Sequence, residues 1–361
     1  MAPVVDSHVH IFPYLGKASG FTSEAEHLWF MQLYMATHGE PVRRVRDHVQ
    51  VHQQTLHDGR LDAADCLREV NFRVGRNGRF EWTVESDDLY LQYFPPSLQG
   101  MESPAEFMLQ QMARAGVDRA VLQNARPYGR LNQYFSEAVR DHPERFIGLA
   151  DVDEPNAADE AEIARLRHAV TELGMRGLYY TNRALLKNSY TKLFDDPSFD
   201  PFWDTVRDLG IPVFWEIFGI PDPSDPQHQL IEIDRLNRWA TRWPTIPGVW
   251  THGFDPELVA RMPASLAELL GRDQILVELL YPIYWARTHE YPYRELRDTV
   301  EALYRRVGRE RLIWGSDMPN VERNCTYRQS LQYLIGLVEG WLPATDLDAI
   351  LGLNVQRLLT G

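Results

Sequence analysis

A short β-strand is predicted by Pro3-Val4-Val5-Asp6-Ser7-His8-Val9-His10, and it ends in two histidines separated by one residue. Side chains alternate between the two faces of a strand, so His8 and His10 lie on the same face. Two imidazoles at the end of a strand can bind one metal ion together. Ordinary surface or core histidines would give the same pair. Residues further along the chain decide whether the two histidines are metal ligands.

The overall composition excludes several classes of protein. The 361 residues carry a formal net charge of −14, which argues against a nucleic-acid surface because phosphate binding needs clustered lysine and arginine. Two cysteines, neither of them in a Cys-x-x-Cys pair, suit a reducing compartment. The N-terminus lacks a basic and apolar leader, and no apolar run reaches about 20 residues. We therefore expect a cytoplasmic protein without a membrane span.

Apolar strands and helices alternate from residue 103 onward. Further strands are predicted over 119–123, 146–150, 177–180, 212–216, 248–251, 274–278 and 311–315. Helices are predicted over 103–116, 131–140, 159–173, 202–209, 225–242, 256–270 and 293–307. Ser103 is the expected N-cap of the first of these helices, and Gly116 its end.

This alternation predicts an α/β fold, a (β/α)8 TIM barrel with a long insertion after strand 1. Buried strands joined by helices pair in parallel, and eight such units close into a barrel. The competing fold is an open, doubly wound sheet. That fold is disfavoured because a Gly-rich phosphate loop is missing after the first strand, where His8 and His10 stand instead.

The insertion covers residues 12–100 of a single 1–361 barrel domain. Helical stretches are expected at 23–37 and 43–56, followed by a hairpin of 71–74 and 79–84. So long a connection is typical of a lid or a binding subregion. Its histidines are irregularly spaced among charged residues, which favours a solvated face; they are His27, His38, His48, His52 and His57.

Polar residues stand at the predicted strand ends, where a barrel assembles its active site. They are His8 and His10, Asn124 and Arg126, Asp151 and Asp153, Tyr180 and Thr181, Glu216, His252, Glu278, and Asp317. His252 and Asp317 directly follow apolar strands, although a buried histidine and a helix cap near Asn320 would give the same pattern. Taken together, His8, His10, a group from the fifth strand, His252 and Asp317 can converge on a metal ion and its water.

These motifs resemble the amidohydrolase superfamily, specifically the amidohydrolase-related branch that includes the aminocarboxymuconate-semialdehyde decarboxylase-like enzymes. The matching text is Asp6-Ser7-His8-Val9-His10, Ala115-Gly116-Val117-Asp118-Arg119-Ala120-Val121, Thr251-His252-Gly253 and Trp314-Gly315-Ser316-Asp317-Met318-Pro319. The resemblance covers most of the chain outside the insertion. It implies that His8, His10 and Asp317 bind a divalent metal ion, and that His252 polarises the substrate or manages a proton.

Glu216 departs from this pattern, since family members usually end strand five with a metal-binding histidine. If Glu216 replaces that ligand, the harder donor set favours Mn, Fe or Mg. Alternatively it bridges two metal ions, with His252 joining the second, or it points elsewhere and leaves a weakened or metal-free site. The expected cofactor is a divalent metal ion (Zn, Mn or Fe), with one or two ions per chain.

The resemblance implies a metal-dependent hydrolase that acts on a small, carboxylate-bearing or aromatic substrate through a metal-bound water. Asp317 would carry the proton and His252 would stabilise the developing charge. The alternative is a nonoxidative decarboxylase of an aromatic or unsaturated acid. A dinuclear Fe or Mn oxygenase and a noncatalytic subunit with a degenerate site are further alternatives.

Arg126, Tyr180 and Arg323 are the candidates for binding the small-molecule substrate. A guanidinium can bind a carboxylate through two hydrogen bonds, although an arginine at a barrel rim also commonly pairs with a neighbouring acid. Tryptophans on the later helices, Trp239, Trp243 and Trp341, are candidates for a subunit interface. We expect a homo-oligomer, and a heteromer is not excluded.

Overall fold

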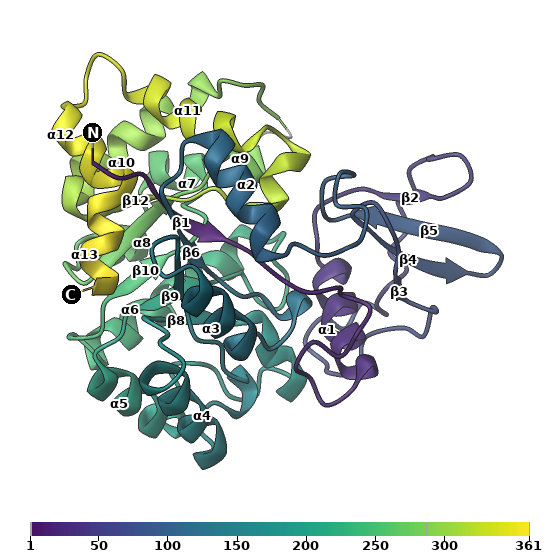
Figure 1. Cartoon of the computed structure of the whole chain (residues 1–361). Helices are drawn as coiled ribbons and strands as arrows, with labels where there is room; N and C mark the ends of the chain where they lie inside the picture. The colour runs from purple at the N-terminus through teal and green to yellow at the C-terminus, as the bar shows by residue number, and fades with distance from the viewer. Residues whose placement is uncertain (1, 286–287, 361) are drawn as a thin grey trace.

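The computed structural model describes residues 2–285 and 288–360 (Figure 1). Within these ranges, eight parallel strands form the centre of the molecule. They are β1 (Val5–Val9), β6 (Arg119–Leu122), β7 (Phe146–Gly148), β8 (Leu178–Thr181), β9 (Val213–Glu216), β10 (Gly248–Trp250), β11 (Ile275–Leu279) and β12 (Leu312–Trp314). All their residues except Arg119 are buried, which fits the mainly apolar sequences of the strands other than β1.

Two seams close these strands into a barrel. The strands form two sheets, with the orders β1-β6-β7 and β12-β11-β10-β9-β8. At one seam the Tyr179 amide donates to the Ala150 carbonyl oxygen at 2.9 Å. At the other, the Asp317 amide donates to the His8 carbonyl oxygen at 2.9 Å, and the His10 amide donates to that of Met318 at 2.7 Å. The predicted (β/α)8 barrel is therefore confirmed.

Helices surround the barrel (Figure 1). They are α2 (Ala105–Ala115), α3 (Asn132–Asp141), α4 (Glu160–Thr171), α5 (Asp200–Leu209), α6 (Pro226–Arg242), α7 (Pro256–Arg261), α8 (Ala264–Leu270), α9 (Pro282–Trp285), α10 (Arg297–Val307), α11 (Tyr327–Val338), α12 (Ala344–Asp348) and α13 (Asn354–Thr360). Gly116 ends α2 in the left-handed conformation, as predicted.

Two helix predictions are wrong in detail. Ser103 does not cap α2, because its hydroxyl donates to the His10 carbonyl oxygen at 3.1 Å and Pro104 takes the N-cap position. The predicted helix over 256–270 is two helices, α7 and α8. The chain breaks between them because Met262 has a positive φ of 43° and Pro263 cannot donate a backbone hydrogen bond.

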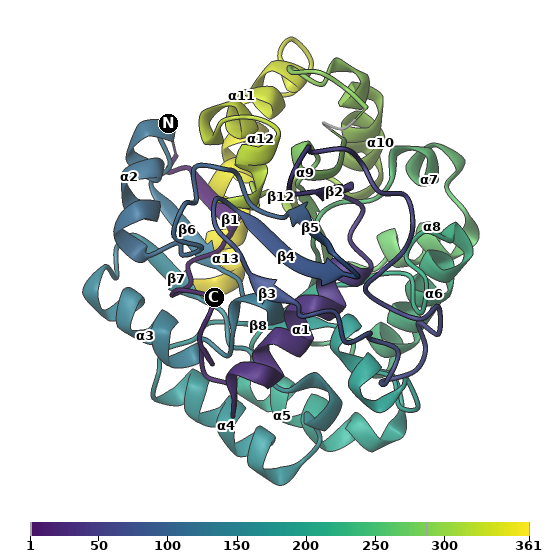
Figure 2. The same ribbon diagram turned by 90° about the vertical axis from the view of Figure 1, so that its right-hand side faces the viewer.

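The insertion forms a separate layer over one end of the barrel (Figure 2). It consists of α1 (Glu24–Ala36) and an antiparallel sheet of the order β2-β5-β4-β3, with β2 (Val42–Arg44), β3 (Arg73–Val74), β4 (Arg79–Val84) and β5 (Asp87–Gln92). The predicted hairpin is confirmed. The predicted helix over 43–56 is wrong, because β2 pairs with β5 and His48, at a φ of 59°, turns the chain back.

Helix α1 is tied to the loops at the barrel end. The His27 ring is buried, with Nδ1 2.6 Å from the Lys17 carbonyl oxygen and Nε2 2.9 Å from that of Pro127. The Lys187 ammonium donates to the Glu26 carboxylate at 2.7 Å. The prediction of a solvated histidine face is therefore wrong for His27, whose Nε2 links α1 to the loop after β6 and whose Nδ1 contacts the segment before α1.

Two of the three tryptophans expected at an interface, Trp239 and Trp243, lie within the chain instead. The third, Trp341, is partly buried and donates to the Leu337 carbonyl oxygen at 2.9 Å. Trp239 is fully buried, and its ring centre is 4.8 Å from that of Trp215 and 5.5 Å from that of Trp203. Trp243 is buried as well, with the Arg207 guanidinium 5.7 Å above it. Neither side chain offers exposed area to another subunit.

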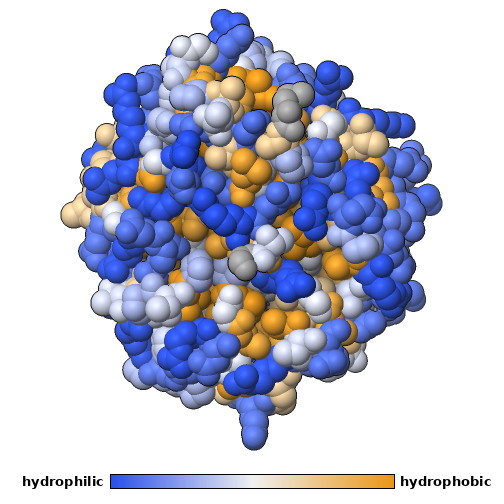
Figure 3. Space-filling view, turned by 60° about the vertical axis from the view of Figure 1, so that its left-hand side comes forward, coloured by the Kyte–Doolittle hydropathy of each residue, from blue (hydrophilic) through white to orange (hydrophobic). Residues whose placement is uncertain are grey.

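The surface has few large exposed hydrophobic side chains. Within the described ranges they are Tyr14, Val49, Ile231, Tyr291 and Leu353. Figure 3 shows one face, on which hydrophobic residues lie in small groups between hydrophilic ones. Among the described residues, no helix combines the length and apolar character that a membrane span requires. The homo-oligomer and the cytoplasmic location remain predictions.

Candidate metal centre

His8, His10 and Asp317 converge at the C-terminal end of the barrel. Their candidate ligand atoms all lie within 4.8 Å of one another, and all three residues are buried. The histidines lie at the end of β1, and Asp317 follows β12. Since the seam between these strands joins the Asp317 amide to His8, barrel closure itself places the carboxylate beside the two imidazoles.

The ring orientations of the two histidines suit a metal ion. His8 Nδ1 lies 2.9 Å from Oε2 of Glu278, and His10 Nδ1 lies 2.8 Å from the Gln123 carbonyl oxygen. Metal-binding histidines usually use one ring nitrogen in this way and direct the other to the metal. His10 Nε2 is 2.8 Å from Oδ1 of Asp317. Two oriented imidazoles and a buried carboxylate therefore fit a divalent ion.

Glu278 also holds the segment that carries His252. Its Oε2 accepts the His252 amide at 3.0 Å, and its Oε1 accepts the Ser7 hydroxyl at 2.5 Å. The ring centres of His8 and His252 are 4.8 Å apart. A Cβ on Gly315 would lie 2.8 Å from both Ser7 Oγ and Glu278 Oε1, so only glycine leaves room for this arrangement.

Asp6 connects the two segments that carry the candidate ligands. Its Oδ1 accepts the amides of His8 and Ser316, each at 3.0 Å, and its Oδ2 accepts the Tyr327 hydroxyl at 2.7 Å. Burial raises the pKa of Asp6 to about 6 despite these hydrogen bonds. Asp6 thereby fixes the ends of β1 and β12 relative to each other.

The buried charges of the centre determine its protonation. Burial opposes the charge of His8, but the charge of Glu278 and the hydrogen bond to it outweigh burial and raise its pKa to about 9. Burial also opposes the charge of Asp317, whereas its hydrogen bond with His10 and the neighbouring histidines lower its pKa to about 2. Burial and the charge of His8 lower the pKa of His252. A carboxylate and a neutral imidazole therefore face the cavity at neutral pH.

His252 and Asp317 share an uncommon backbone conformation. Their φ angles are 64° and 63°, in the left-handed region that non-glycine residues seldom adopt. Such conformations persist where the surroundings impose them, and they cluster at functional sites. Here the amide bonds to Glu278 and to His8 impose them.

A cavity of about 710 Å³ opens from this centre. His10, Glu216, His252, Asp317, Asn320 and Arg323 are among its lining residues. The insertion contributes Tyr34, Ala36, Thr37, His38, Gly39, Gln54, His57, Leu61 and Tyr93. The insertion therefore forms part of the wall around the candidate metal centre.

Glu216 lies in the same cavity but not in the converging group. It is buried at the end of β9, and its Oε2 accepts the Tyr34 hydroxyl at 3.3 Å. Among the described residues, the group whose ligand atoms lie within 4.8 Å of one another contains His8, His10 and Asp317 only. A metal-binding role for Glu216 remains a prediction.

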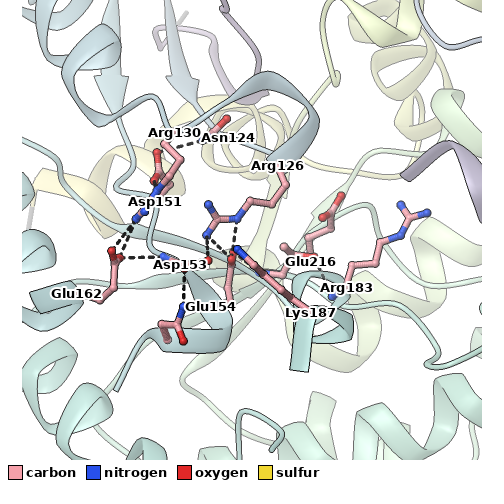
Figure 4. A network of polar contacts seen from close by, with 12 residues as sticks. Asn124, Arg126, Arg130, Asp151, Asp153, Glu154, Glu162, Arg183, Lys187 and Glu216 are labelled. Carbon is pink, nitrogen blue, oxygen red and sulfur yellow. Dashed lines mark hydrogen bonds and ion pairs between the residues drawn. The ribbon is translucent and has the colours of Figure 1, made fainter. Parts of the chain in front are cut away.

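Of the three predicted substrate-binding residues, the structure brings only Arg323 to the cavity. Its Nη1 is 3.4 Å from Oε1 of Glu40 in the insertion. Arg126 pairs instead with Glu154, through hydrogen bonds from Nε at 2.8 Å and from Nη2 (Figure 4). Burial disfavours the charge of Arg126, but the charges of Glu154 and neighbouring aspartates outweigh burial and raise its pKa above the usual value. The guanidinium therefore stays charged.

Tyr180 faces the helices rather than the cavity. Its ring centre is 5.3 Å from those of Trp203 and Trp215. In the register of β8 and β9, Tyr180 pairs with Trp215, and Thr181 pairs with Glu216. Successive side chains of a strand point to opposite faces, so the Tyr180 side chain points out of the barrel toward the helices.

Several side chains of the site are not predicted from the sequence. Asn320 donates to Asp317 Oδ1 and to the Tyr128 hydroxyl, both at 2.8 Å. Arg183 donates to the Tyr34 carbonyl oxygen at 3.0 Å, and its guanidinium carbon lies 4.2 Å above the Tyr34 ring. The position of Asn320, three residues after the candidate ligand Asp317, was the available signal. For Tyr34 the irregular insertion offered none.

Fold and site together define a (β/α)8-barrel protein with a buried His-His-Asp group at the C-terminal ends of its strands. The model of the amidohydrolase family matches residues 5–360. The chain therefore belongs to the amidohydrolase family, which confirms the resemblance carried by the sequence motifs.

Two curated relatives share part of the sequence. The 2-amino-3-carboxymuconate-6-semialdehyde decarboxylase of Dictyostelium discoideum is 35% identical over 92 residues, which is 25% of this chain and 24% of that protein. The gamma-resorcylate decarboxylase of Rhodococcus jostii (strain RHA1) is 31% identical over 116 residues, 30% of this chain and 32% of that protein. The matches thus span about a quarter to a third of each relative.

Solved structures share the fold at low sequence identity. A 2,6-dihydroxybenzoate decarboxylase in complex with 2,6-dihydroxybenzoate matches with a TM-score of 0.56 and 17% identity, covering 72% of this chain and 89% of that chain. A dihydroxybenzoic acid decarboxylase from Polaromonas sp. JS666, with bound manganese and 2-nitroresorcinol, matches at 0.54 and 16%, covering 70% and 85%. These likenesses support the barrel fold.

Proposed function

We propose that the chain is a metal-dependent nonoxidative decarboxylase of a small-molecule acid, in place of the hydrolase that the sequence analysis put first. The observation that carries the proposal is one cavity in which His10 and Asp317 of the His-His-Asp group lie with His252 and Arg323. Both curated relatives named above are decarboxylases, which favours carbon dioxide release over hydrolysis.

The chain's own residues have separate roles in this reaction. A divalent ion held by His8, His10 and Asp317 would supply positive charge for the substrate carboxylate and its adjacent oxygen. Nonoxidative decarboxylation requires a proton on the carbon that loses carbon dioxide, and the electron pair of the broken C–C bond then remains in the product. His252 and Asp317 are the proton carriers in this scheme, since both line the cavity beside His10. Arg323 binds an anionic group.

Manganese is the ion we propose first. A donor set that includes carboxylate is harder than one of imidazoles alone, and hard donors suit manganese. The Polaromonas decarboxylase was solved with manganese bound.

The test is carbon dioxide release from a panel of hydroxybenzoates by protein loaded with Mn, Fe or Zn in turn. We expect one carbon dioxide for each acid consumed with at least one metal, and loss of release on chelation. Hydrolysis of amides or lactones in the same preparations, with no carbon dioxide from any acid, would contradict the proposal and restore the hydrolase.

Glu216→His is expected to change the metal preference. Exchanging a carboxylate for an imidazole softens the donor set, so the ratio of bound Zn to Mn should rise about tenfold. Elemental analysis after dialysis against equal concentrations of both metals measures this ratio, and the unaltered chain is the control.

The same elemental analysis separates the interpretations of Glu216. One ion per chain in the unaltered protein agrees with a fourth ligand, and two ions agree with a bridging carboxylate. An identical metal profile in Glu216→His and the unaltered protein would exclude Glu216 from the ligands.

A further inference from the structure

The cavity is much larger than a single-ring acid needs. A benzene ring fits a protein cavity of about 150 Å³, and drug-sized ligands occupy pockets of about 300–1,000 Å³. The cavity that opens from the metal centre measures about 710 Å³. A dihydroxybenzoate placed with its carboxylate at His10 and Asp317 would leave most of this space filled with water.

The walls beyond the metal centre are mainly apolar. Phe218, Trp250, Phe254, Leu258 and Ile283 line the cavity from the barrel loops. The insertion adds Tyr34, Ala36 and Leu61 on the facing wall. Water molecules make few hydrogen bonds beside apolar walls. The apolar surface of a ligand buried there contributes about 25 cal/mol of favourable free energy for each Å² removed from water.

Leu61 places the insertion wall close to the loop after β9. Leu61, Phe218 and Pro223 line the large cavity and also line the small pocket next to it. Both segments therefore border the cavity and this small pocket. His57 and Asp222 also line the cavity.

Arg183 is held against the wall of this space by the protein. It donates to the Tyr34 carbonyl oxygen and to the Thr37 hydroxyl, and its guanidinium carbon lies 4.2 Å from the Tyr34 ring centre and 4.7 Å from that of Phe218. Its Nη2 is thus engaged with the protein, and its flat face packs on two aromatic rings. The apolar side chains of this wall, with Leu61 and Phe254 among them, suit an apolar part of a ligand.

We propose that the substrate is an acid with a large apolar body, of two or three rings or an equivalent aliphatic framework. The carboxylate lies at His10, His252 and Asp317, and the body lies between the insertion and the loops after β9 and β10. The position of the carboxylate in this inference rests on the proposed function. The size of the apolar body is inferred from the volume and lining of the cavity. The insertion is then a fixed wall that selects the substrate, consistent with the ties of α1 to the barrel.

The test compares acids that share one head group. Dissociation constants for salicylate, 5-phenylsalicylate and 5-(2-naphthyl)salicylate are measured by calorimetry on manganese-loaded protein. We expect the dissociation constant to fall about tenfold or more from salicylate to 5-phenylsalicylate, because the added ring is removed from water. We expect the naphthyl compound to bind at least as tightly.

Leu61→Trp fills the proposed region and leaves the metal centre unchanged. It should weaken binding of 5-phenylsalicylate by about tenfold and leave salicylate within about twofold. Val49→Trp is the matched control, since Val49 is exposed on the same insertion and is not a cavity-lining residue. If Leu61→Trp does not fold, Ala36→Phe adds bulk to the same wall.

The outcomes separate this inference from the proposed function. Equal dissociation constants across the three acids, or equal weakening of all three by the filling variant, would overturn it. Selective binding of the larger acids without carbon dioxide release would contradict the decarboxylase and leave this inference standing. Carbon dioxide release from salicylate, with equal dissociation constants for the three acids, would support the decarboxylase and overturn this inference.

Discussion

Asp317→Asn is expected to lower kcat about 10³-fold or more while the protein stays folded. The carboxylate lies 2.8 Å from His10 Nε2 and accepts the Asn320 amide at 2.8 Å. Asparagine keeps the size and one acceptor oxygen, but it removes the charge that a metal ion needs and the group that carries a proton. Steady-state carbon dioxide release measures the loss, and metal content and circular dichroism are measured on the same samples.

Asp346→Asn is the matched control for this variant. Asp346 is also a buried aspartate, but it binds Tyr304 and Arg309 and is not a cavity-lining residue. Its kcat should remain within about twofold of the unaltered protein, whatever happens to stability. Full activity in Asp317→Asn would refute both roles assigned to this carboxylate.

Arg126→Met should cost about 3–5 kcal/mol in the free energy of unfolding. Arg126 and Glu154 are both almost fully buried, so removing the guanidinium leaves the Glu154 carboxylate without its partner in a region of low dielectric constant. The double variant Arg126→Met/Glu154→Leu should recover most of this loss, because it removes both charges. Chemical denaturation followed by circular dichroism measures all three proteins.

A surface pair gives the contrast. Arg207 and Asp204 are 2.6 Å apart with about half of each side chain exposed, and Arg207→Met should change stability by less than about 1 kcal/mol. A similarly small change in Arg126→Met would contradict the structural role. The double variant also tests the prediction that Arg126 binds substrate. If it does, its removal would raise KM even where the double variant regains stability.

The barrel could be predicted because each of its parts is local. Apolar runs of strand length recur between helices, and a barrel then assigns every strand end to one face. His8, His10 and Asp317 are correctly brought together by this reasoning, because the first and last strands of a closed barrel are neighbours. The helix boundaries failed where proline or a tertiary contact decided them, as at Pro263 and Ser103.

Two of the three residues predicted to bind substrate, Arg126 and Tyr180, do not line the cavity, for two different physical reasons. An arginine binds a substrate carboxylate and a protein carboxylate equally well, so the sequence could not tell whether Glu154 or a ligand occupies Arg126. Tyr180 was within reach of sequence reasoning. If Glu216 points inward, the parallel register turns Thr181 inward and Tyr180 outward.

Tyr34 could not have been found from the sequence. Its place above Glu216 depends on tertiary contacts such as those of His27, which join α1 to distant loops. No periodicity in the insertion encodes those contacts.

The seam between β1 and β12 has a consequence for biosynthesis. His10 and Asp317 are 307 residues apart in the chain, so the candidate ligand group is incomplete until Asp317 has left the ribosome and β12 has docked beside β1. Binding of a metal ion at this group would therefore follow synthesis and folding of the whole barrel. A ligand that binds only the folded state stabilises it by mass action, so an ion bound at this seam would hold the first and last strands together. Without such an ion, β1 and β12 would separate more readily.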